Sequence, residues 1–265
     1  MSGRPEHVDQ RDYVQSLERG LSVILAFADH HAKLTLSEIA AIAGLSRPTT
    51  RRLLLTLESL GYVRADGRTF SLTPHVLTLG YAYLNSLDLT AIAQPIMERI
   101  VAQAHETCTL ATLDGSDIVY VSRISTRRIG SLSLVIGTRL PAYASAMGQT
   151  VLADLSPAGL RHYLETTELE AITPHTIRTE AALHERLAKV RKRGWAEVDQ
   201  EIETGLRSIA APVRGSDGRV FAGLGLSSSA LTVRELRERH LAALLEGAAE
   251  ISSRLGSEFS ARPPG

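Results

Sequence analysis

The chain has 265 residues, 44% hydrophobic and 22% charged, with a formal net charge of zero, which is typical of one large or two ordinary globular domains. No apolar run approaches the ~20 residues that span a membrane, and the first residues lack the apolar core of a secretory signal. Cys108 is the one cysteine, which excludes an internal disulfide and a multi-cysteine zinc site, so we expect a cytoplasmic protein.

The chain begins with a polar segment and continues with a helical pattern. Residues 1–12 show no periodicity, and we expect a disordered tail. From residue 13, apolar side chains recur at helical spacing, which predicts a helix whose apolar face supports the helices that follow. The residues on that face are Val14, Leu17, Leu21, Ile24, Leu25 and Ala28.

Residues 34–60 carry the start and stop signals of two short helices. Thr35 and Glu38 have the spacing of a capping box, so a helix should begin after Thr35 and end at Gly44. Ser46 is suited to cap a second helix, and Pro48 fits its first turn, where the missing N–H costs nothing. Two short helices around a glycine turn, the second basic near its start, are typical of a helix-turn-helix. The apolar face of the second helix should comprise Thr50, Leu53, Leu54, Leu57 and Leu60.

Two short strands follow and predict a wing, at residues 62–65 and 68–72 around an Asp66-Gly67 turn. Between residues 47 and 68 five arginines outnumber two acidic residues, and this local charge of +3 favours phosphate contacts. The alternative is an ordinary helical hairpin beside a β-hairpin. We predict a winged domain over residues 13–72 that binds double-stranded DNA through Ser46, Arg47, Thr49, Thr50, Arg51 and Arg52, with Arg64 and Arg68 on the backbone or minor groove.

The remaining chain predicts a linker helix and an α+β domain. Residues 73–88 form a helix that is apolar on several faces, so we expect it to join the two domains and to contact a second copy. Residues 89–104 form an apolar stripe that Pro95 either kinks or shortens. The second domain extends to residue 258 as strands flanked by helices, and residues 259–265 are expected to be disordered. The expected strands are residues 107–113, 118–124, 131–136, 195–198, 208–213 and 220–226.

An arginine-rich stretch in the second domain predicts an anion site. It contains Arg123, Arg127, Arg128 and Arg139. A guanidinium holds a carboxylate through two parallel hydrogen bonds, so small organic acids are the expected ligands. Tyr143 adds a flat apolar surface with a hydroxyl, and the helix that follows Ser145 offers free N–H groups to an anion. The alternative is that these arginines are solvated or pair with Asp114, Asp117 or nearby glutamates.

Several short motifs along the chain are specific when they are taken together. They are Ser16-Leu17-Glu18-Arg19-Gly20-Leu21, Gly44-Leu45-Ser46, Thr49-Thr50-Arg51-Arg52-Leu53-Leu54, Leu60-Gly61-Tyr62, Gly194-Trp195, residues 199–206 and Ala210-Ala211-Pro212-Val213. This set resembles the IclR family of bacterial transcription regulators over nearly the whole chain. The resemblance implies an α+β protein in which a linker helix joins an N-terminal winged helix-turn-helix to a GAF-like α/β effector-binding domain. It also implies homodimers, often paired into dimers of dimers, on palindromic operators.

Residues 123–129 and 136–148 resemble one subgroup of that family, which controls protocatechuate and 4-hydroxybenzoate catabolism. The resemblance implies an effector such as protocatechuate, 4-hydroxybenzoate or β-ketoadipate. The subgroup commonly has Arg or Lys where this chain has Gln149, a departure that bears on the identity of the ligand. Family pockets imply that Ala146, Met147, Leu206, Ser208, Gly225 and Ser227 line the site beside Arg123, Arg128, Arg139, Tyr143 and Ser145. The two pocket serines would donate hydrogen bonds to the ligand or, alternatively, face a neighbouring backbone.

The case for an enzyme is small. Asp199, Glu201 and Glu203 alternate along the chain and would share one face if extended, which suits a metal or acid–base chemistry. The alternative is a solvated edge or ion pairs with Arg207 and Arg214. The sequence has no phosphate loop and no nucleophile elbow. We therefore predict a regulator of aromatic-acid catabolic genes with no cofactor, metal or membrane partner. Two alternatives stay open: a regulator that senses a glyoxylate- or pyruvate-like acid of another carbon-source pathway, and an enzyme that acts on an aromatic or keto acid.

Overall fold

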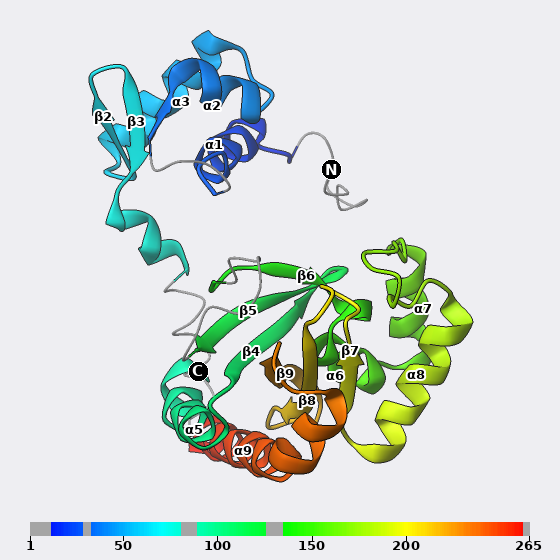
Figure 1. Cartoon of the computed structure of the whole chain (residues 1–265). Coiled ribbons are helices and arrows are strands. Elements are labelled where there is room, and N and C mark those ends of the chain that lie inside the picture. The colour runs from blue at the N-terminus through cyan, green and yellow to red at the C-terminus, as the bar shows by residue number, and fades with distance from the viewer. Residues whose placement is uncertain (1–11, 29–32, 81–88, 126–134, 262–265) are drawn as a thin grey trace. The chain divides into compact units, whose positions relative to one another are not determined.

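The computed structural model describes residues 12–28, 33–80, 89–125 and 135–261 (Figure 1). The chain divides into two compact units, residues 1–83 and 84–265, and each has its own hydrophobic core. Within the described ranges, no helix combines the length and apolar character that a membrane span requires.

The first unit is a helix-turn-helix with a small sheet. Its elements are α1 (Gln15–Leu25), β1 (Leu34–Thr35), α2 (Leu36–Ile42), α3 (Arg47–Ser59), β2 (Val63–Asp66) and β3 (Thr69–Leu72). The predicted capping box is present, because Thr35 Oγ1 accepts from the Glu38 N–H while the Glu38 carboxylate accepts from the Thr35 N–H. Gly44 follows α2 with a φ of 65°, and Ser46 caps α3 by accepting from the Thr49 N–H. These local signals account for both helices and for the tight turn between them.

The wing is a three-stranded antiparallel sheet in the order β1-β3-β2. Asp66 is paired with Thr69, so the turn is Gly67-Arg68 and lies one residue later than predicted. Arg68 is therefore a turn residue and not a strand residue. Gly67 has a φ of 62°, a conformation that favours glycine because it has no Cβ. Strand β1 is missing from the prediction, because two residues are too few to show an alternating pattern.

The apolar stripe of α1 faces the opposite way from the prediction. Val23 and Phe27 pack into the core with Ile39 and Leu54. Most of the predicted packing residues are instead exposed, Val14 by 61%, Leu17 by 63%, Leu21 by 47% and Leu25 by 68%. The prediction that this stripe supports the next two helices is therefore wrong, and only Ile24 of that set packs against the core.

The first unit continues into the start of the predicted linker helix. The 3-10 turn η1 (Pro74–Val76) follows Thr73, whose side chain caps it, and residues 77–80 are helical. Residues 81–88 of the predicted linker helix lie outside the described residues.

The second unit is a six-stranded antiparallel sheet with helices on both faces, the predicted α+β arrangement (Figure 1). The strands are β4 (Thr107–Asp114), β5 (Asp117–Ile124), β6 (Arg139–Pro141), β7 (Ala196–Asp199), β8 (Arg207–Arg214) and β9 (Val220–Ser228), in the spatial order β6-β5-β4-β9-β8-β7. The helical elements are α5 (Leu89–Ala104), η2 (Ala142–Ala144), α6 (Ala146–Asp154), α7 (Pro157–Glu165), α8 (Glu180–Arg193) and α9 (Val233–Ala261).

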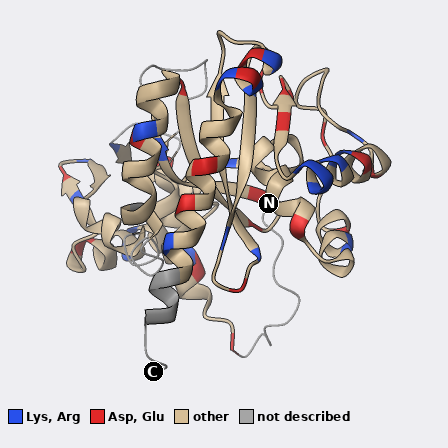
Figure 2. Cartoon of the chain, turned by 90° about the horizontal axis from the view of Figure 1, so that it is seen from below, with Lys and Arg blue, Asp and Glu red and all other residues tan. Residues whose placement is uncertain are grey.

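Two apolar layers hold this sheet. Helices α5 and α9 lie side by side on one face, where Ile96 and Leu244 join Leu110 and Leu224 of the strands (Figure 1). Helices α6, α7 and α8 provide the layer on the other face, which includes Tyr143. Acidic and basic residues are interspersed along α9 (Figure 2), and pairs such as Arg234–Glu238 join neighbouring turns. On this helix the positive and negative charges therefore lie close together and cancel locally.

Two boundaries differ from the prediction. Residues 131–134 of the expected strand 131–136 lie outside the described residues, and the remaining two precede a turn at Gly137. The edge strand is instead β6, which pairs with β5. Helix α5 agrees with the predicted stripe, because it begins at Leu89 and continues through Pro95, so Pro95 does not shorten it. Helix α9 extends to Ala261, inside the segment 259–265 that was expected to be disordered.

Candidate nucleic-acid interface and effector site

The start of α3 presents a row of cations to solvent. Arg47, Arg51 and Arg52 are exposed, and none of them forms an ion pair with a described residue. In this unit the one ion pair between described residues joins Lys33 Nζ to the Asp66 carboxylate at 2.6 Å, and it holds the pKa of Asp66 below its usual range. The three guanidinium groups therefore keep their charge and hydrogen-bond donors available for phosphates or bases.

Neighbouring threonines on α3 have different environments. The Thr49 hydroxyl is partly exposed and lies 2.8 Å from the Ser46 hydroxyl at the start of the helix. Thr50 is fully buried, and its hydroxyl donates to the Ser46 carbonyl at 3.0 Å. Thr50 therefore stabilises the helix and has no surface for DNA, which corrects its predicted role as a contact.

Further exposed side chains accompany the start of α3, on the wing and in a groove beside α1. Arg64 on β2 and Arg68 in the wing turn are both exposed. A groove of about 610 Å³ between α1 and α3 is lined by Thr49 and Arg52 and also by Gln15, Ser16 and Arg19. The apolar periodicity of α1 gives no indication of these three polar side chains.

In the second unit, strand register gathers several of the predicted effector residues. Ser227 of β9 lies opposite Ser208 of β8, and Gly225 lies opposite Thr109 of β4, which in turn lies opposite Arg123 of β5. Residues directly opposite one another share a face of the sheet, and so do alternate residues of one strand. Arg123, Ser208, Gly225 and Ser227 therefore share one face, together with Thr109, which the sequence analysis missed.

Helix α6 begins on that same face. A Cβ on Gly225 would lie 2.8 Å from Met147 Cγ, and a Cβ on Gly148 would lie 2.2 Å from the Ala142 carbonyl oxygen. Gly148 is therefore required by the close approach of the helix to the Ala142 backbone, while Gly225 leaves room for the Met147 side chain. Ser145 caps the helix by accepting from the Gly148 N–H, and Ala146 begins it. The predicted residues of this helix start thus lie against the face that carries Arg123.

Arg123 is the most unusual group of this set. Its side chain is half-buried, and Nε is a buried donor with no hydrogen-bond partner among the described residues. Burial raises the pKa of the neighbouring Tyr120 to about 12, while the charge of Arg123 opposes that shift. An unpaired buried donor costs free energy, so this guanidinium is suited to an acceptor supplied by a ligand.

Arg139 does not join this group. Its guanidinium donates to the carboxylates of Asp114 and Asp117 beside the β4–β5 turn, the latter at 3.1 Å, and to the Asp114 carbonyl at 2.8 Å. The hydrogen bond to Asp114, more than any other effect, raises the pKa of Arg139. Arg139 therefore follows the alternative prediction for this stretch, in which an arginine pairs with Asp114 or Asp117. Arg127 and Arg128 lie outside the described residues.

Of two further predicted residues, Tyr143 has a structural role and Leu206 lies directly before β8. Tyr143 is buried, and its hydroxyl donates to the Glu170 carbonyl at 2.9 Å. Leu206 is partly buried and immediately precedes β8, and its N–H donates to the Glu203 carbonyl at 3.0 Å. Tyr143 is therefore a core residue with its polar group satisfied.

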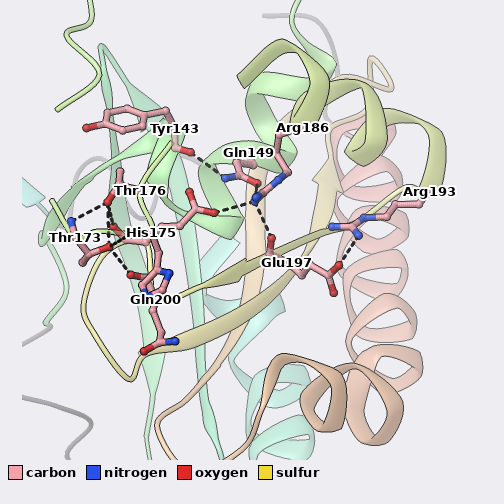
Figure 3. Close-up of polar contacts among 10 residues, drawn as sticks. Tyr143, Gln149, Thr173, His175, Thr176, Arg186, Arg193, Glu197 and Gln200 are labelled. Carbon is pink, nitrogen blue, oxygen red and sulfur yellow. Dashed lines mark hydrogen bonds and ion pairs between the residues drawn. The ribbon is translucent and has the colours of Figure 1, made fainter. Parts of the chain in front are cut away.

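Gln149, the residue that departs from the subgroup, is fully buried between two partners (Figure 3). Its side-chain amide donates to the Tyr143 carbonyl at 2.9 Å and accepts from Arg186 at 3.4 Å. A neutral side chain at this position lets Arg186 approach without a second cation beside it.

The acidic run does not form a metal site. Asp199 pairs with Arg207 at 3.1 Å, as the ion-pair alternative expected, while Glu201 pairs with Arg186 at 2.9 Å. Arg214 pairs instead with Asp154. Within the described ranges, no group of three or more His, Cys, Asp or Glu side chains is placed to hold a metal ion.

A helix-turn-helix with free arginines and a sheet domain with a half-buried cation define the class of DNA-binding regulators with a ligand-binding domain. Residues 16–67 match the IclR helix-turn-helix domain, and residues 81–254 match the C-terminal domain of the bacterial transcriptional regulator IclR. The chain belongs to the IclR family of transcription regulators and is not an enzyme.

Individual proteins agree with this assignment. The Pca regulon regulatory protein of Pseudomonas putida is 43% identical over 247 residues, which cover 92% of this chain and 85% of that protein. A crystal structure from Rhodococcus sp. RHA1 has a TM-score of 0.83 at 43% identity and covers 93% of this chain and 100% of its own. The structure of an IclR homolog complexed with 4-hydroxybenzoate from Microbacterium hydrocarbonoxydans has a TM-score of 0.81 at 26% identity, with coverages of 91% and 99%.

Proposed function

We propose that this chain senses a small carboxylic acid of the protocatechuate/β-ketoadipate pathway and controls the genes for aromatic-acid breakdown. The effector would be protocatechuate, 4-hydroxybenzoate or β-ketoadipate. The similarity to the Pseudomonas putida regulator supports the pathway, and the 4-hydroxybenzoate complex of the Microbacterium hydrocarbonoxydans homolog supports the ligand class.

The observation that carries the proposal is the buried Nε of Arg123, which has no partner among the described residues and shares a sheet face with Ser208 and Ser227. A carboxylate on Arg123 would satisfy that donor through a charge-assisted hydrogen bond. The two serines would donate to a second polar group of the ligand, and Met147 would contact its apolar part.

The first unit would supply the DNA contacts. We propose that α3 enters the major groove of a palindromic operator, where side chains near its start contact bases and phosphates. The proposed contacts are Ser46, Arg47, Thr49, Arg51 and Arg52, with Arg64 and Arg68 on the backbone or minor groove. A role on bacterial DNA requires a cytoplasmic location.

A palindromic operator requires at least a homodimer. The family resemblance also implies that two such dimers associate into a dimer of dimers. Exposed apolar residues support a subunit contact on α1. Leu17, Leu21 and Leu25 are each 47–68% exposed and occupy one side of the helix at spacings of four residues. We propose that this side packs against a second copy, which would remove it from water.

The test is a thermal-shift screen of the full chain with protocatechuate, 4-hydroxybenzoate, β-ketoadipate, catechol and pyruvate, followed by calorimetry on each ligand that stabilises. A ligand that binds only the folded state raises the melting temperature. In Arg123→Gln the affinity should fall about 10-fold or more, because a charge-assisted hydrogen bond is lost. Arg139→Gln is the matched control, since Arg139 pairs with Asp114 and Asp117.

Either of two results would contradict the proposal. A shift with pyruvate alone would assign the chain to another carbon-source pathway. An equal loss of ligand affinity in Arg123→Gln and Arg139→Gln would show that the effect is not specific to Arg123, and Arg123 would then not be assigned to the ligand site.

A further inference from the structure

A second cavity, of about 410 Å³, lies at the β7 edge of the sheet, and its lining shares no residue with the proposed effector site. Its volume is in the range of small-molecule sites. Six of its lining side chains are charged: Arg186, Lys189, Arg193, Glu197, Asp199 and Glu201.

The two signs of charge come from different elements. Arg186, Lys189 and Arg193 all belong to α8, at spacings that place them on one side of the helix. Glu197 and Asp199 belong to the edge strand β7, and Glu201 follows it. The cavity therefore has a basic wall and an acidic wall, and their formal charges cancel.

Most of the acidic wall is already neutralised. Glu197 accepts from Arg193 at 2.8 Å (Figure 3) and also from Arg237 at 3.3 Å, and Asp199 pairs with Arg207 at 3.1 Å. These carboxylates therefore keep little capacity for a ligand.

Glu201 differs from the other two acids. It is 2% exposed, and only Oε1 pairs with Arg186, while Oε2 is buried with no hydrogen-bond partner among the described residues. Burial raises the pKa of Glu201, and the Arg186 guanidinium and, less strongly, the Ile177 backbone N–H oppose the shift. An additional positive donor would stabilise the charged form of this carboxylate.

The basic wall also has unused donors. Arg186 makes its contacts with Gln149, Glu197 and Glu201 through a single amino group (Figure 3). Its Nε and its second amino group have no partner within the described part of the chain. Among the described residues, Lys189 forms an ion pair with Glu185 alone, at 2.7 Å on the exposed side of α8. An anion can therefore bind this wall without breaking an ion pair inside the cavity.

We propose that this cavity binds a small zwitterion of the α-amino-acid class. The ligand carboxylate binds Arg186 and Lys189, and the ligand ammonium group donates to Glu201. A zwitterion offers a carboxylate to Arg186 and Lys189 and a positive donor to Glu201, whereas a simple anion has no donor for Glu201 and a simple cation has no acceptor for the basic wall. This site is independent of the proposed aromatic-acid effector.

Calorimetry on the full chain tests the site with a panel of L-amino acids that spans the side-chain types, in the millimolar range. At least one amino acid should bind saturably. Its counterpart without the amino group should bind about 10-fold more weakly or worse, because the hydrogen bond to Glu201 is lost. Lys189→Gln and Glu201→Gln should each weaken binding to a similar extent. Lys189 is exposed, so its variant keeps the fold even if Glu201→Gln does not.

Lys192→Gln is the matched control, because Lys192 is an exposed residue of α8 that does not line the cavity. It should bind like the unchanged chain, and so should Arg123→Gln. The proposal is overturned if no amino acid binds, if the desamino compound binds equally well, or if Lys189→Gln behaves like Lys192→Gln. Loss of binding in Arg123→Gln would also overturn it, since the amino acid would then occupy the effector site.

Discussion

Arg123 and Arg139 are two arginines of one sequence stretch whose surroundings differ completely. Arg123 lies opposite Thr109, and its Nε has no partner in the described part of the chain, whereas Arg139 lies opposite Val119 and pairs with Asp114 and Asp117. The sequence predicted an anion site in this stretch but not which arginine is free. That distinction depends on which strands pair and in which register, and local residue patterns do not contain this information.

At the same scale, Arg51 tests the DNA-binding surface. Replacing Arg51 by Ala should weaken operator binding about 10-fold or more, because one contact to a base or phosphate is worth about 1–3 kcal/mol. Fluorescence anisotropy at fixed salt measures the effect, and Arg161→Ala on α7 is the control with the same charge change outside the DNA-binding unit. Unchanged affinity for a mapped operator would remove the start of α3 from the interface.

The elements show where sequence patterns are strong and where they fail. The helices α2 and α3 follow from caps at Thr35 and Ser46, which are local signals. The orientation of α1 does not follow, because periodicity identifies an apolar side but not what covers it. The position of α6 against the sheet is also set by residues far apart in the sequence. A Cβ on Gly223 would lie 2.7 Å from the Met147 carbonyl oxygen, and local periodicity cannot predict a contact between such distant residues.

Helix α1 can be tested by cross-linking. Cys108 is buried, and burial raises the pKa of its thiol to about 12, so a new surface cysteine reacts alone. If the exposed side of α1 contacts a second copy, Leu21→Cys should form a disulfide-linked dimer under mild oxidation. Leu60→Cys is the control, since Leu60 is 58% exposed but lies outside that helix. Equal cross-linking of the two variants would exclude α1 as the subunit contact.

The whole chain combines two units with separate cores, an organisation that the change from a helix-turn-helix pattern to strands flanked by helices predicted. An effector that alters operator affinity must bind two states of the protein with different strength. The sign of the response does not follow from either unit alone, because it depends on which of the two states binds the operator better.

Thermodynamic linkage gives the sharpest prediction for the whole molecule. If the effector changes the operator affinity by some factor, the operator must change the effector affinity by the same factor, typically about 5- to 150-fold. Anisotropy with and without saturating effector measures one side, and calorimetry with and without operator measures the other. Arg123→Gln should abolish both changes while it leaves operator binding intact in the absence of effector. Equal operator affinity with and without a ligand that does bind would show that the ligand does not act at the DNA-binding step, and the effector would then have to act after the operator is occupied.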